Sequence, residues 1–528
     1  MPQPPAASVA IVTLGCGRNE VDSDQLAGHL TQAGLPVVPE AADAEVVLVN
    51  TCTFIGPAKQ ESVDTILAAC DLKEHGAARA VLVVGCMAQR YPQELADAIP
   101  EADAVVGFDG YAALPGLVAD VLAGRTTDRV VGVGAPDPGS RPPRQLPLVA
   151  ADRPRPTSVL GLGVAELPPD AARFGPGLGT AQDALDRIPA TGPRFPVRRH
   201  DGRPWAYLKI ASGCDRVCTF CAIPSFRGRF RSRPLDELLA EAAWLAEQGA
   251  RELVLVSENT TSWGKDLPGG RDQQPRLLRE LAQVDGVERL RLMYLQPAEL
   301  TWPLLEALLG EPKVASYLDL SLQHVAAPVV RRMARSGDHV RFGQLIRQVR
   351  SLDPDAVFRS NFILGFPGET DADVDVLEAF LEEHRLDWVG LFPFSREDGT
   401  PSDLLPDQVP EEVAAARVAR IAATQELLAD EAARRFVGRE LAVTVEATAG
   451  RGADELTVGR SYREAPDTDG EVVLVAAGTG GIDGLPADLP VGRTVTARVV
   501  ATAGVDLVAE VAGGAGRVAE ATGGRGRG

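Results

Sequence analysis

Apolar residues along the first 130 positions gather in short runs separated by stretches of helical length. The runs at 9–14, 46–49 and 81–84 are continuous and rich in valine and leucine, and an amphipathic stretch at 58–74 separates the last two. Continuous apolar strands that alternate with helices are typical of a parallel sheet covered on both faces. The pattern predicts an α/β domain at 7–133.

The same alternation of strand and helix returns at 199–434, where a helix is predicted at 235–247. The strand candidates lie at 207–210, 253–256, 290–295, 317–320, 358–364 and 388–394. Six strand–helix units predict an open or complete barrel of parallel strands.

Short apolar runs with turns between them follow at 438–510. They predict a small all-β sandwich or barrel of about five strands. The connector at 134–198 differs from all three, because 13 of the 61 residues from Pro136 to Pro196 are proline. We expect a mostly disordered Pro/Gly-rich insertion there, with a short helix possible at 181–188, and a flexible tail at 511–528.

The 528 residues carry a net charge of −20, with a pI near 4.9. Such a chain would repel nucleic acid at long range and attract a basic protein, although many bacterial-type enzymes are simply acidic. No apolar run is long enough for a membrane span, and the polar start does not resemble a signal peptide. The lack of a signal-like start and the odd number of cysteines together predict a cytoplasmic protein.

Three of the seven cysteines, Cys214, Cys218 and Cys221, stand in the spacing C-x3-C-x2-C. Three thiolates can bind three irons of a four-iron cluster and leave the fourth iron open for a substrate or cofactor. A structural zinc site needs four ligands, and no fourth cysteine lies within a hundred residues on either side. Chance clustering of buried cysteines is the other alternative. The spacing favours an open iron–sulfur cluster after the first barrel strand, where barrel enzymes place their chemistry.

Three further cysteines, Cys16, Cys52 and Cys86, each follow one of the predicted amino-terminal strands. Carboxyl ends of parallel strands lie along one edge of the sheet, so these cysteines are expected to converge there. Cys70 falls in the middle of a helix and is predicted to be a small buried hydrophobe.

The chain resembles the radical S-adenosylmethionine methylthiotransferases over nearly everything except the insertion and the tail. The matching stretches begin at Leu14, Val49, Gly85, Gly213, Gly365 and Gly459 and occur in the family's order. The resemblance implies an amino-terminal domain with three cluster cysteines, a radical S-adenosylmethionine barrel and a small carboxy-terminal β domain called TRAM.

Within the family, the chain is most similar to the branch that modifies an aspartate of small-subunit ribosomal protein twelve. The likeness rests on the amino-acid sequence at residues 19–23, 54–62 and 221–234. The predicted β domain agrees, because it carries twelve acids against six arginines and no lysine, which suits a basic protein better than RNA. Departures include Gly17-Arg18, where relatives commonly have Pro-Lys.

The resemblance implies two [4Fe-4S] clusters and S-adenosyl-L-methionine. Cys214, Cys218 and Cys221 would hold the cluster that cleaves this cofactor to a radical, which removes a hydrogen from the β-carbon of the aspartate. The cluster on Cys16, Cys52 and Cys86 would carry the sulfur, which is methylated before transfer. The implied partners are ribosomal protein twelve, a reductant such as flavodoxin or ferredoxin and a sulfur donor. No membrane is expected, and transfer RNA is disfavoured as a partner.

The resemblance also implies cofactor contacts, each with a plainer alternative. Gly365, Gly368 and Glu369 lie on a turn after a barrel strand, where glycine lets the backbone approach a ligand, or they form an ordinary turn. Phe220 would orient the cluster loop and the adenine, or is a core aromatic. Ser257 and Glu258 would bind the cofactor's ammonium group, or belong to a solvated loop.

Two features stay open. His324 ends a barrel strand and either faces the site or is a satisfied structural histidine. The alternating Arg227, Arg229, Arg231 and Arg233 either grip an acidic group or form a solvated or cluster-screening face. The rival functions are the transfer RNA branch of the same family and a non-enzymatic iron–sulfur electron carrier.

Overall fold

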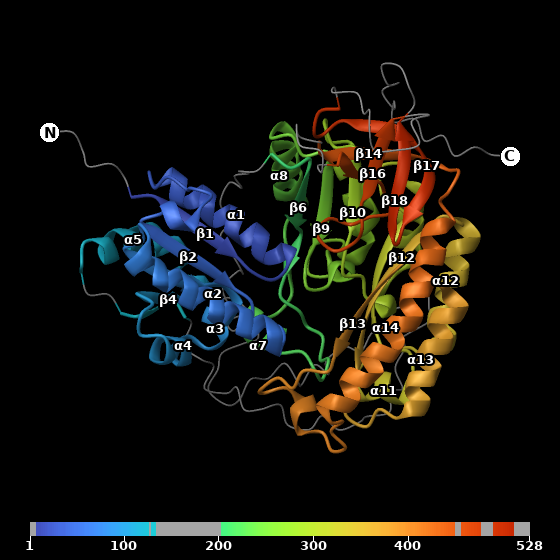
Figure 1. The fold of residues 1–528 in the computed structure, drawn as a ribbon, viewed down its shortest axis with the longest axis horizontal. Coiled ribbons are helices and arrows are strands. Elements are labelled where there is room, and N and C mark those ends of the chain that lie inside the picture. Colours follow the sequence, from blue (N-terminus) through green and yellow to red (C-terminus); the bar gives the residue numbers. More distant parts are fainter. Residues whose placement is uncertain (1–6, 126–127, 134–201, 449–455, 477–488, 512–528) are drawn as a thin grey trace.

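The computed structural model describes residues 7–125, 128–133, 202–448, 456–476 and 489–511, and these form three units built on sheets (Figure 1). The Pro/Gly-rich insertion predicted at 134–198, its short helix, and the tail predicted at 511–528 apart from Val511 lie outside the described residues. No helix of the described part is long and apolar enough to cross a membrane.

The amino-terminal unit is a parallel sheet of order β1-β2-β3-β4-β5. Its elements are β1 (Val9–Thr13), α1 (Gly17–Gln32), β2 (Val46–Thr51), α2 (Gly56–His75), β3 (Ala80–Val84), α3 (Gly85–Arg90), α4 (Pro92–Ala98), β4 (Ala104–Val106), α5 (Leu114–Leu122) and β5 (Val130–Val131). Val37 forms a parallel bridge with Val9, on the side of β1 away from β2. The order in which strands are added to the sheet therefore reverses between β1 and β2. The carboxyl ends of the strands at such a switch point are where open parallel sheets bind ligands.

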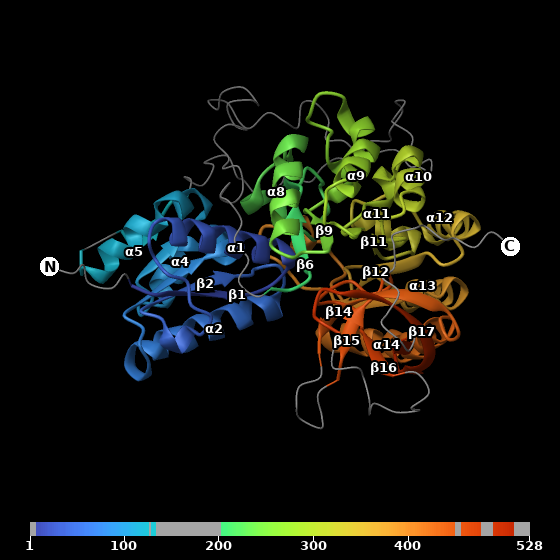
Figure 2. The same cartoon turned by 90° about the horizontal axis from the view of Figure 1, so that it is seen from above.

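Alternate residues of the central strands face opposite layers. Val46 and Leu48 of β2 belong to the core shared with α1 and α5, whereas Val47 and Val49 belong to the core shared with α2, α3 and α4. All four side chains are fully buried. This confirms the prediction of a parallel sheet covered on both faces, and Figure 2 shows the helices on its two sides.

The central unit is an open arc of six parallel strands. Strands β10-β9-β6 and β11-β12-β13 form two three-stranded sheets, joined by the bridges Leu290–Val314 and Leu295–Leu320. Its elements are β6 (Trp205–Lys209), β7 (Ala211–Ser212), α7 (Ile223–Arg227), β8 (Arg231–Ser232), α8 (Leu235–Glu247), β9 (Glu252–Val256), α9 (Gln274–Ala282), β10 (Arg289–Leu292), α10 (Trp302–Gly310), β11 (Tyr317–Gln323), α11 (Ala327–Arg332), α12 (His339–Leu352), β12 (Val357–Leu364), α13 (Asp371–His384), β13 (Trp388–Pro393) and α14 (Glu411–Arg434). The barrel is thus of the open kind, with β6 and β13 at its edges.

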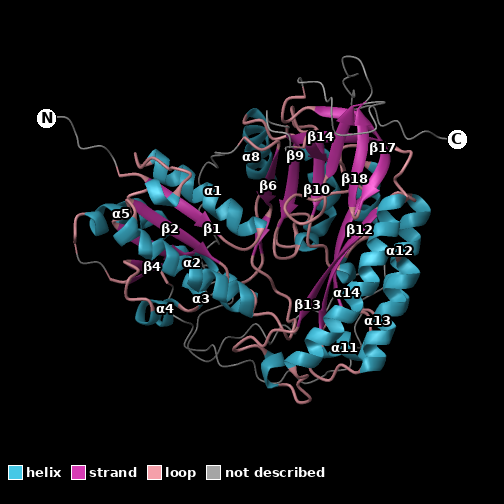
Figure 3. Ribbon diagram, viewed as in Figure 1, coloured by secondary structure: helices cyan, strands magenta, loops and turns pink. Residues whose placement is uncertain are grey.

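The carboxy-terminal unit is a closed five-stranded barrel of order β14-β15-β16-β18-β17 (Figure 3). Its strands are β14 (Glu440–Ala447), β15 (Val458–Arg460), β16 (Val472–Ala476), β17 (Thr494–Ala503) and β18 (Asp506–Val511). It packs against the amino-terminal ends of the central strands, where Tyr317 donates to Asp469 and Trp388 donates to the carbonyl of Arg463. The carboxyl ends of the central strands remain available for the chemistry.

Some of the acids of this β barrel are not available to a partner. Asp469 is buried beside Arg359, and Glu464 is fully buried beside Arg463. The count of acids in the sequence therefore overstates the negative charge on the surface of this unit.

A buried carboxylate joins the two barrels. Glu252 at the start of β9 lies 2.7 Å from Arg291 Nε and 3.0 Å from Arg460 Nη1, the latter on β15. Burial alone would raise the pKa of Glu252, but Arg291, Arg460 and Arg289 outweigh it and lower the pKa to about 2. The ionised carboxylate therefore stabilises the folded state at neutral pH.

We expect Glu252→Gln to lower the free energy of unfolding by about 3 kcal/mol at pH 7, which corresponds to the lowered pKa. The folded-state pKa lies below the ordinary value of 4.5, so the stabilisation is present above pH 4.5 and is lost as the pH falls toward 2. Urea unfolding at pH 7 and pH 4 should show that the difference in unfolding free energy between the wild type and Glu252→Gln becomes smaller at the lower pH. Glu280→Gln, which removes an exposed pair with Arg276, is the control and should cost no more than about 1 kcal/mol.

The amino-terminal unit docks onto the central arc at both of its edges. Near β6, Asp22 of α1 forms buried ion pairs with Lys209 and Arg227. After β13, Glu397 accepts from Lys59 at 3.0 Å and from Arg90 at 2.8 Å. The unit therefore spans the opening of the arc, on the side where the parallel strands end.

Candidate functional site: two sets of thiols at a domain junction

The first thiol set forms where β1, β2 and β3 end. Cys16, Cys52 and Cys86 line one cavity of about 30 Å³ together with residues of the central unit. Gly15 has φ +95°, and a Cβ there would lie 2.9 Å from Cys52 Sγ. Glycine at this turn is therefore required for the close approach of the first two strand ends. The convergence predicted from the strand ends is confirmed.

Asn19 on α1 ties the three strand ends together. Its Nδ2 donates to the carbonyls of Leu14 at 2.9 Å and Thr51 at 3.0 Å. Its Oδ1 accepts from Arg227 at 2.8 Å and lies 3.4 Å from Cys86 Sγ. The buried amide thereby fixes the separation of the strand ends that carry the thiols.

Two arginines donate to sulfurs of this set. Arg18 Nε lies 3.3 Å from Cys16 Sγ, and Arg227 Nη2, which comes from the central unit, lies 3.0 Å from Cys86 Sγ. Burial raises the pKa of Cys16, but Arg18 and Arg227 outweigh it, so the pKa is lowered. At Cys86 burial dominates and raises the pKa to about 11. Cys16 is therefore the more readily ionised of these two thiols, and thiolates are the form that binds metal.

The second thiol set lies on the loop between β7 and α7. The backbone of this loop is held by hydrogen bonds from Cys221 N to the Cys218 carbonyl and from Cys214 N to the Gly228 carbonyl, both 3.1 Å. Arg335 Nη1 donates to Cys218 Sγ at 3.3 Å. Burial raises the pKa of Cys218, yet Arg335 and Arg216 outweigh it and the pKa is lowered. Each set thus holds one thiol activated by an arginine.

The chemistry of the donors suits an iron–sulfur cluster. In an iron–sulfur cluster each thiolate binds a separate iron, so the sulfurs do not need to meet at one point. N–H groups that donate to the sulfurs are among the features that tune such clusters. Three cysteines with arginine donors in each set therefore fit a cluster.

Glu258, which follows β9, lies at the junction between the two sets. It lines the cavity of Cys16, Cys52 and Cys86, and its charge also acts on the thiol of Cys214. Its side chain is only 2% exposed, and neither carboxylate oxygen has a hydrogen-bond partner among the described residues. A buried carboxylate without a donor fits a cationic group of a ligand, as was predicted for the cofactor's ammonium group.

Ser257 has a local role in the same loop. Its hydroxyl accepts from Asn259 N at 3.1 Å and lies 3.4 Å from Thr260 Oγ1. The side chain is fully buried, so it shapes the loop that carries Glu258. Its predicted contact with a cofactor stays a prediction.

The glycines of the turn at 365–369 are explained by the packing and backbone conformation of the turn. A Cβ at Gly365 would lie 2.3 Å from that of Ala414 on α14, and one at Gly368 would meet the guanidinium of Arg332; both glycines have positive φ. Close packing therefore accounts for these glycines without a ligand.

Glu369 and His324 are buried partners of this turn. Glu369 Oε1 accepts from Gly365 N at 2.9 Å and from Arg417 Nη1 at 3.0 Å. His324 Nδ1 accepts from Ala326 N at 3.0 Å, which leaves the proton on Nε2, 3.4 Å from Glu369 Oε2. Neither Nε2 nor Oε2 has a hydrogen-bond partner among the described residues, so the structural role of His324 stays a prediction. Phe220 packs beside Phe366 of this turn, in an apolar cluster next to the second thiol set.

The four alternating arginines separate into different environments. Arg227 reaches the first thiol set, Arg229 lies 3.9 Å from Asp215, and Arg233 pairs with Glu241 at 2.6 Å. Arg231 on β8 is half-buried. Among the pairs described, only Arg227 screens a thiol set. That set is Cys16, Cys52 and Cys86, which is distant in the sequence, and not the nearby set of Cys214, Cys218 and Cys221.

Two arginines that act on the second thiol set were not predicted from the sequence. Arg335 follows α11, and Arg216 pairs with Glu299 at 2.6 Å. Nothing in their sequence neighbourhood marks them, although Arg216 lies between two cysteines of the second set. Cys70 is buried among apolar residues of the amino-terminal unit, as predicted.

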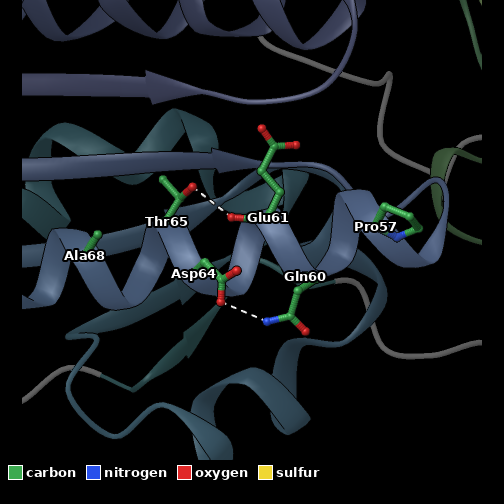
Figure 4. A pocket seen from close by; sticks show the side chains of 6 residues that line it. All are labelled: Pro57, Gln60, Glu61, Asp64, Thr65 and Ala68. Carbon is green, nitrogen blue, oxygen red and sulfur yellow. Dashed lines mark hydrogen bonds between the residues drawn. The ribbon is translucent and has the colours of Figure 1, made fainter.

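A larger hollow of about 600 Å³ lies on the outer face of α2 (Figure 4). All six of its lining side chains come from this helix: Pro57, Gln60, Glu61, Asp64, Thr65 and Ala68. Gln60 donates to Asp64 and Thr65 to the Glu61 carbonyl, so its polar groups pair within the helix. It contains no thiol and does not belong to the site.

Three family models match the chain. Residues 8–107 match the uncharacterized protein family UPF0004, residues 208–381 the radical SAM superfamily and residues 437–512 the TRAM domain. The chain is also similar to two proteins named ribosomal protein uS12 methylthiotransferase RimO. The protein from Kineococcus radiotolerans is 48% identical over 95% of this chain and 97% of its own length. The protein from Streptomyces coelicolor is 47% identical over 96% of this chain and 97% of its own length.

A solved structure, the radical S-adenosylmethionine methyltransferase TsrM from Kitasatospora setae, is less similar. It shares 16% identity and a TM-score of 0.48 over 85% of this chain and 80% of that chain. A likeness at this level carries no functional argument.

Proposed function

Because the chain belongs to the ribosomal protein uS12 methylthiotransferase family, we propose that it inserts a methylthio group at the β-carbon of an aspartate in this small-subunit protein. It is a radical S-adenosylmethionine enzyme that uses an iron–sulfur cluster and S-adenosylmethionine. The single observation that supports the proposal best is the junction of the two thiol sets. Cys16, Cys52 and Cys86 share their cavity with Arg227 and Glu258 of the central unit.

We assign one [4Fe-4S] cluster to each set. Cys214, Cys218 and Cys221 would hold the cluster at the carboxyl ends of the central strands, and Cys16, Cys52 and Cys86 would hold the other. When bound, the clusters and S-adenosylmethionine supply the radical that abstracts hydrogen from carbon and the sulfur that replaces it. Neither step is available to a protein side chain.

The chain's own groups position these components. Arg335 and Arg18 donate to Cys218 and Cys16, which favours the thiolate form that binds iron. The carboxylate of Glu258, whose oxygens accept no hydrogen bond among the described residues, would accept the ammonium group of S-adenosylmethionine together with Ser257. The turn at Gly365, Gly368 and Glu369 would contact the same cofactor. Phe220 and Ile223 add apolar surface near the two sets, which limits the access of water.

The proposed partners follow from this reaction. The net charge of −20 favours a basic substrate such as a ribosomal protein and disfavours transfer RNA. A reductant such as flavodoxin or ferredoxin would supply electrons, and a separate donor would supply sulfur. We place the reaction in the cytoplasm, where both the ribosome and reduced thiols are found.

Mass spectrometry of uS12 tests the proposal. Incubated with reconstituted enzyme, S-adenosylmethionine, sulfide and reductant, uS12 should gain one methylthio group on an aspartate. Cys16→Ala should stop this modification but still release 5′-deoxyadenosine, because Cys16 belongs to the set that does not cleave the cofactor. The matched control is Cys70→Ala, which removes a buried cysteine outside both sets and should retain both reactions.

Two other outcomes would favour the rival functions. A methylthio group on a transfer RNA adenosine, with uS12 unmodified, would assign the chain to the transfer RNA branch. Reduced protein that holds iron and sulfide but never releases 5′-deoxyadenosine would instead be an electron carrier. Retained modification of uS12 by Cys16→Ala would contradict the role given to the first thiol set.

A further inference from the structure

Arg18 lies between the two thiol sets. Its Nε donates to Cys16 Sγ at 3.3 Å, and its Nη1 is 3.8 Å from Glu258 Oε1. Its guanidinium carbon lies 5.1 Å from the ring centre of Tyr294, which follows β10. Its charge also acts on Cys221, where burial raises the pKa and Arg18 opposes the rise. Arg18 therefore carries a positive charge from the amino-terminal unit into the mouth of the central unit.

Two arginines line this cavity, but only one has a free face. Arg227 is 3% exposed and is engaged by Asn19, by Cys86 and by Asp22 at 3.1 Å. Arg18 is 15% exposed, and within the described ranges Nε makes its only hydrogen bond. The two Nη groups of Arg18 form a planar fork that matches a carboxylate in bidentate geometry.

Glu258 provides a second, independent sign of a ligand here. Both of its oxygens are buried and lack donors, although the fork of Arg18 lies nearby. At 3.8 Å the pair is an ion pair without a hydrogen bond. Arg227 Nε is also 3.9 Å from Glu258 Oε1, again without a hydrogen bond. The junction thus presents a carboxylate and a cationic fork that attract each other but keep their hydrogen-bonding positions free, which suits a ligand set that carries both charges.

Building on the proposed function, we infer that Arg18 is a specificity-determining residue that binds the side-chain carboxylate of the substrate aspartate. That carboxylate is attached to the β-carbon at which the reaction takes place. Its capture by the fork of Arg18 therefore holds the β-carbon between the two thiol sets. Glu258 then remains for the cationic group of the cofactor. An asparagine or a nucleobase offers no negative charge to Arg18 and is disfavoured.

The test compares the binding of uS12 with that of a uS12 variant whose target aspartate is replaced by asparagine. Reconstituted wild-type enzyme should bind the asparagine form about 10- to 100-fold more weakly, as expected for loss of a charge-assisted hydrogen-bonded pair. In Arg18→Gln the ratio of the two dissociation constants should fall to about 1. Arg18→Lys, which keeps the charge, should restore part of the preference.

Two control variants separate recognition from effects on iron. Cys52→Ala is expected to lose iron from the first set but keeps Arg18 and its hydrogen bond to Cys16, and should retain the preference for aspartate. Arg276→Gln changes an exposed arginine on α9 and should leave the ratio unchanged. Iron and sulfide content is measured for every variant.

The outcomes are distinguishable from failure of the proposed function. If the wild-type enzyme does not modify uS12, the proposed function fails. If it does modify uS12 while Arg18→Gln keeps the wild-type preference for aspartate over asparagine, the recognition by Arg18 is overturned. Loss of the preference in Cys52→Ala would likewise overturn it, because the cluster rather than Arg18 would then be responsible.

Discussion

Cys214→Ala is expected to abolish the release of 5′-deoxyadenosine from S-adenosylmethionine. Three thiolates hold three irons of an open cluster, and with one thiolate removed the second set keeps only Cys218 and Cys221. The first set draws its cysteines from a different unit, so its iron should remain. Anaerobic reconstitution should therefore yield roughly half of the wild-type iron, and chromatography should detect no 5′-deoxyadenosine.

Cys70→Ala is again the matched control, because this cysteine is buried in the amino-terminal unit away from both sets. It should retain full iron content and full cleavage of the cofactor. Production of 5′-deoxyadenosine by Cys214→Ala at the wild-type rate would contradict the assignment of the second set.

Asp22→Ala is expected to destabilise the docking of the amino-terminal unit by about 3–5 kcal/mol. Asp22 is 1% exposed and pairs with Lys209 and Arg227, which are both 3% exposed. Its removal leaves two buried cations without their carboxylate, and a broken buried pair costs far more than a surface pair. Urea unfolding, followed together with hydrogen exchange of α1, measures the loss.

Asp120→Ala serves as the control for this prediction, because Asp120 pairs with Arg125 at the surface. Surface pairs contribute about 0–1 kcal/mol, so the unfolding midpoint should hardly move. Equal midpoints for Asp22→Ala and Asp120→Ala would show that the buried pairs do not hold the two units together.

The convergence of Cys16, Cys52 and Cys86 could be predicted because it follows from parallel topology. Each cysteine comes directly after an apolar strand, and parallel strands end along one edge. The same local reasoning identified the loop of the second set and the buried position of Cys70. In these cases the relevant information is local: the strand that precedes Cys16, Cys52 or Cys86, the spacing of the second set, and the helix that contains Cys70.

The contacts across the junction could not be predicted, because they depend on how two units pack. Arg18 and Glu258 are 240 positions apart, and no periodicity links them. Arg227 could be noticed from its alternation with other arginines, but its partner Cys86 lies in another unit. Arg335 reaches Cys218 only because α11 ends beside the cluster loop. Packing between units, not local pattern, creates this part of the site.

The turn at 365–369 shows the opposite difficulty. Its glycines matched the pattern expected of a ligand-binding turn, yet the close approach of Ala414 to Gly365 and the positive φ of both Gly365 and Gly368 already require them. A glycine motif can therefore reflect the packing of a neighbouring helix as well as the approach of a ligand.

The open arc of the central unit has a consequence for the solubility of fragments. Within the described residues, its edge strands β6 and β13 have no partner strand on one side, and unprotected edges promote pairing between molecules. In the whole chain α1 packs against β6, and the loop after β13 is held by Lys59 and Arg90. A fragment that begins after the amino-terminal unit should therefore aggregate, because that unit would no longer cover these two edges.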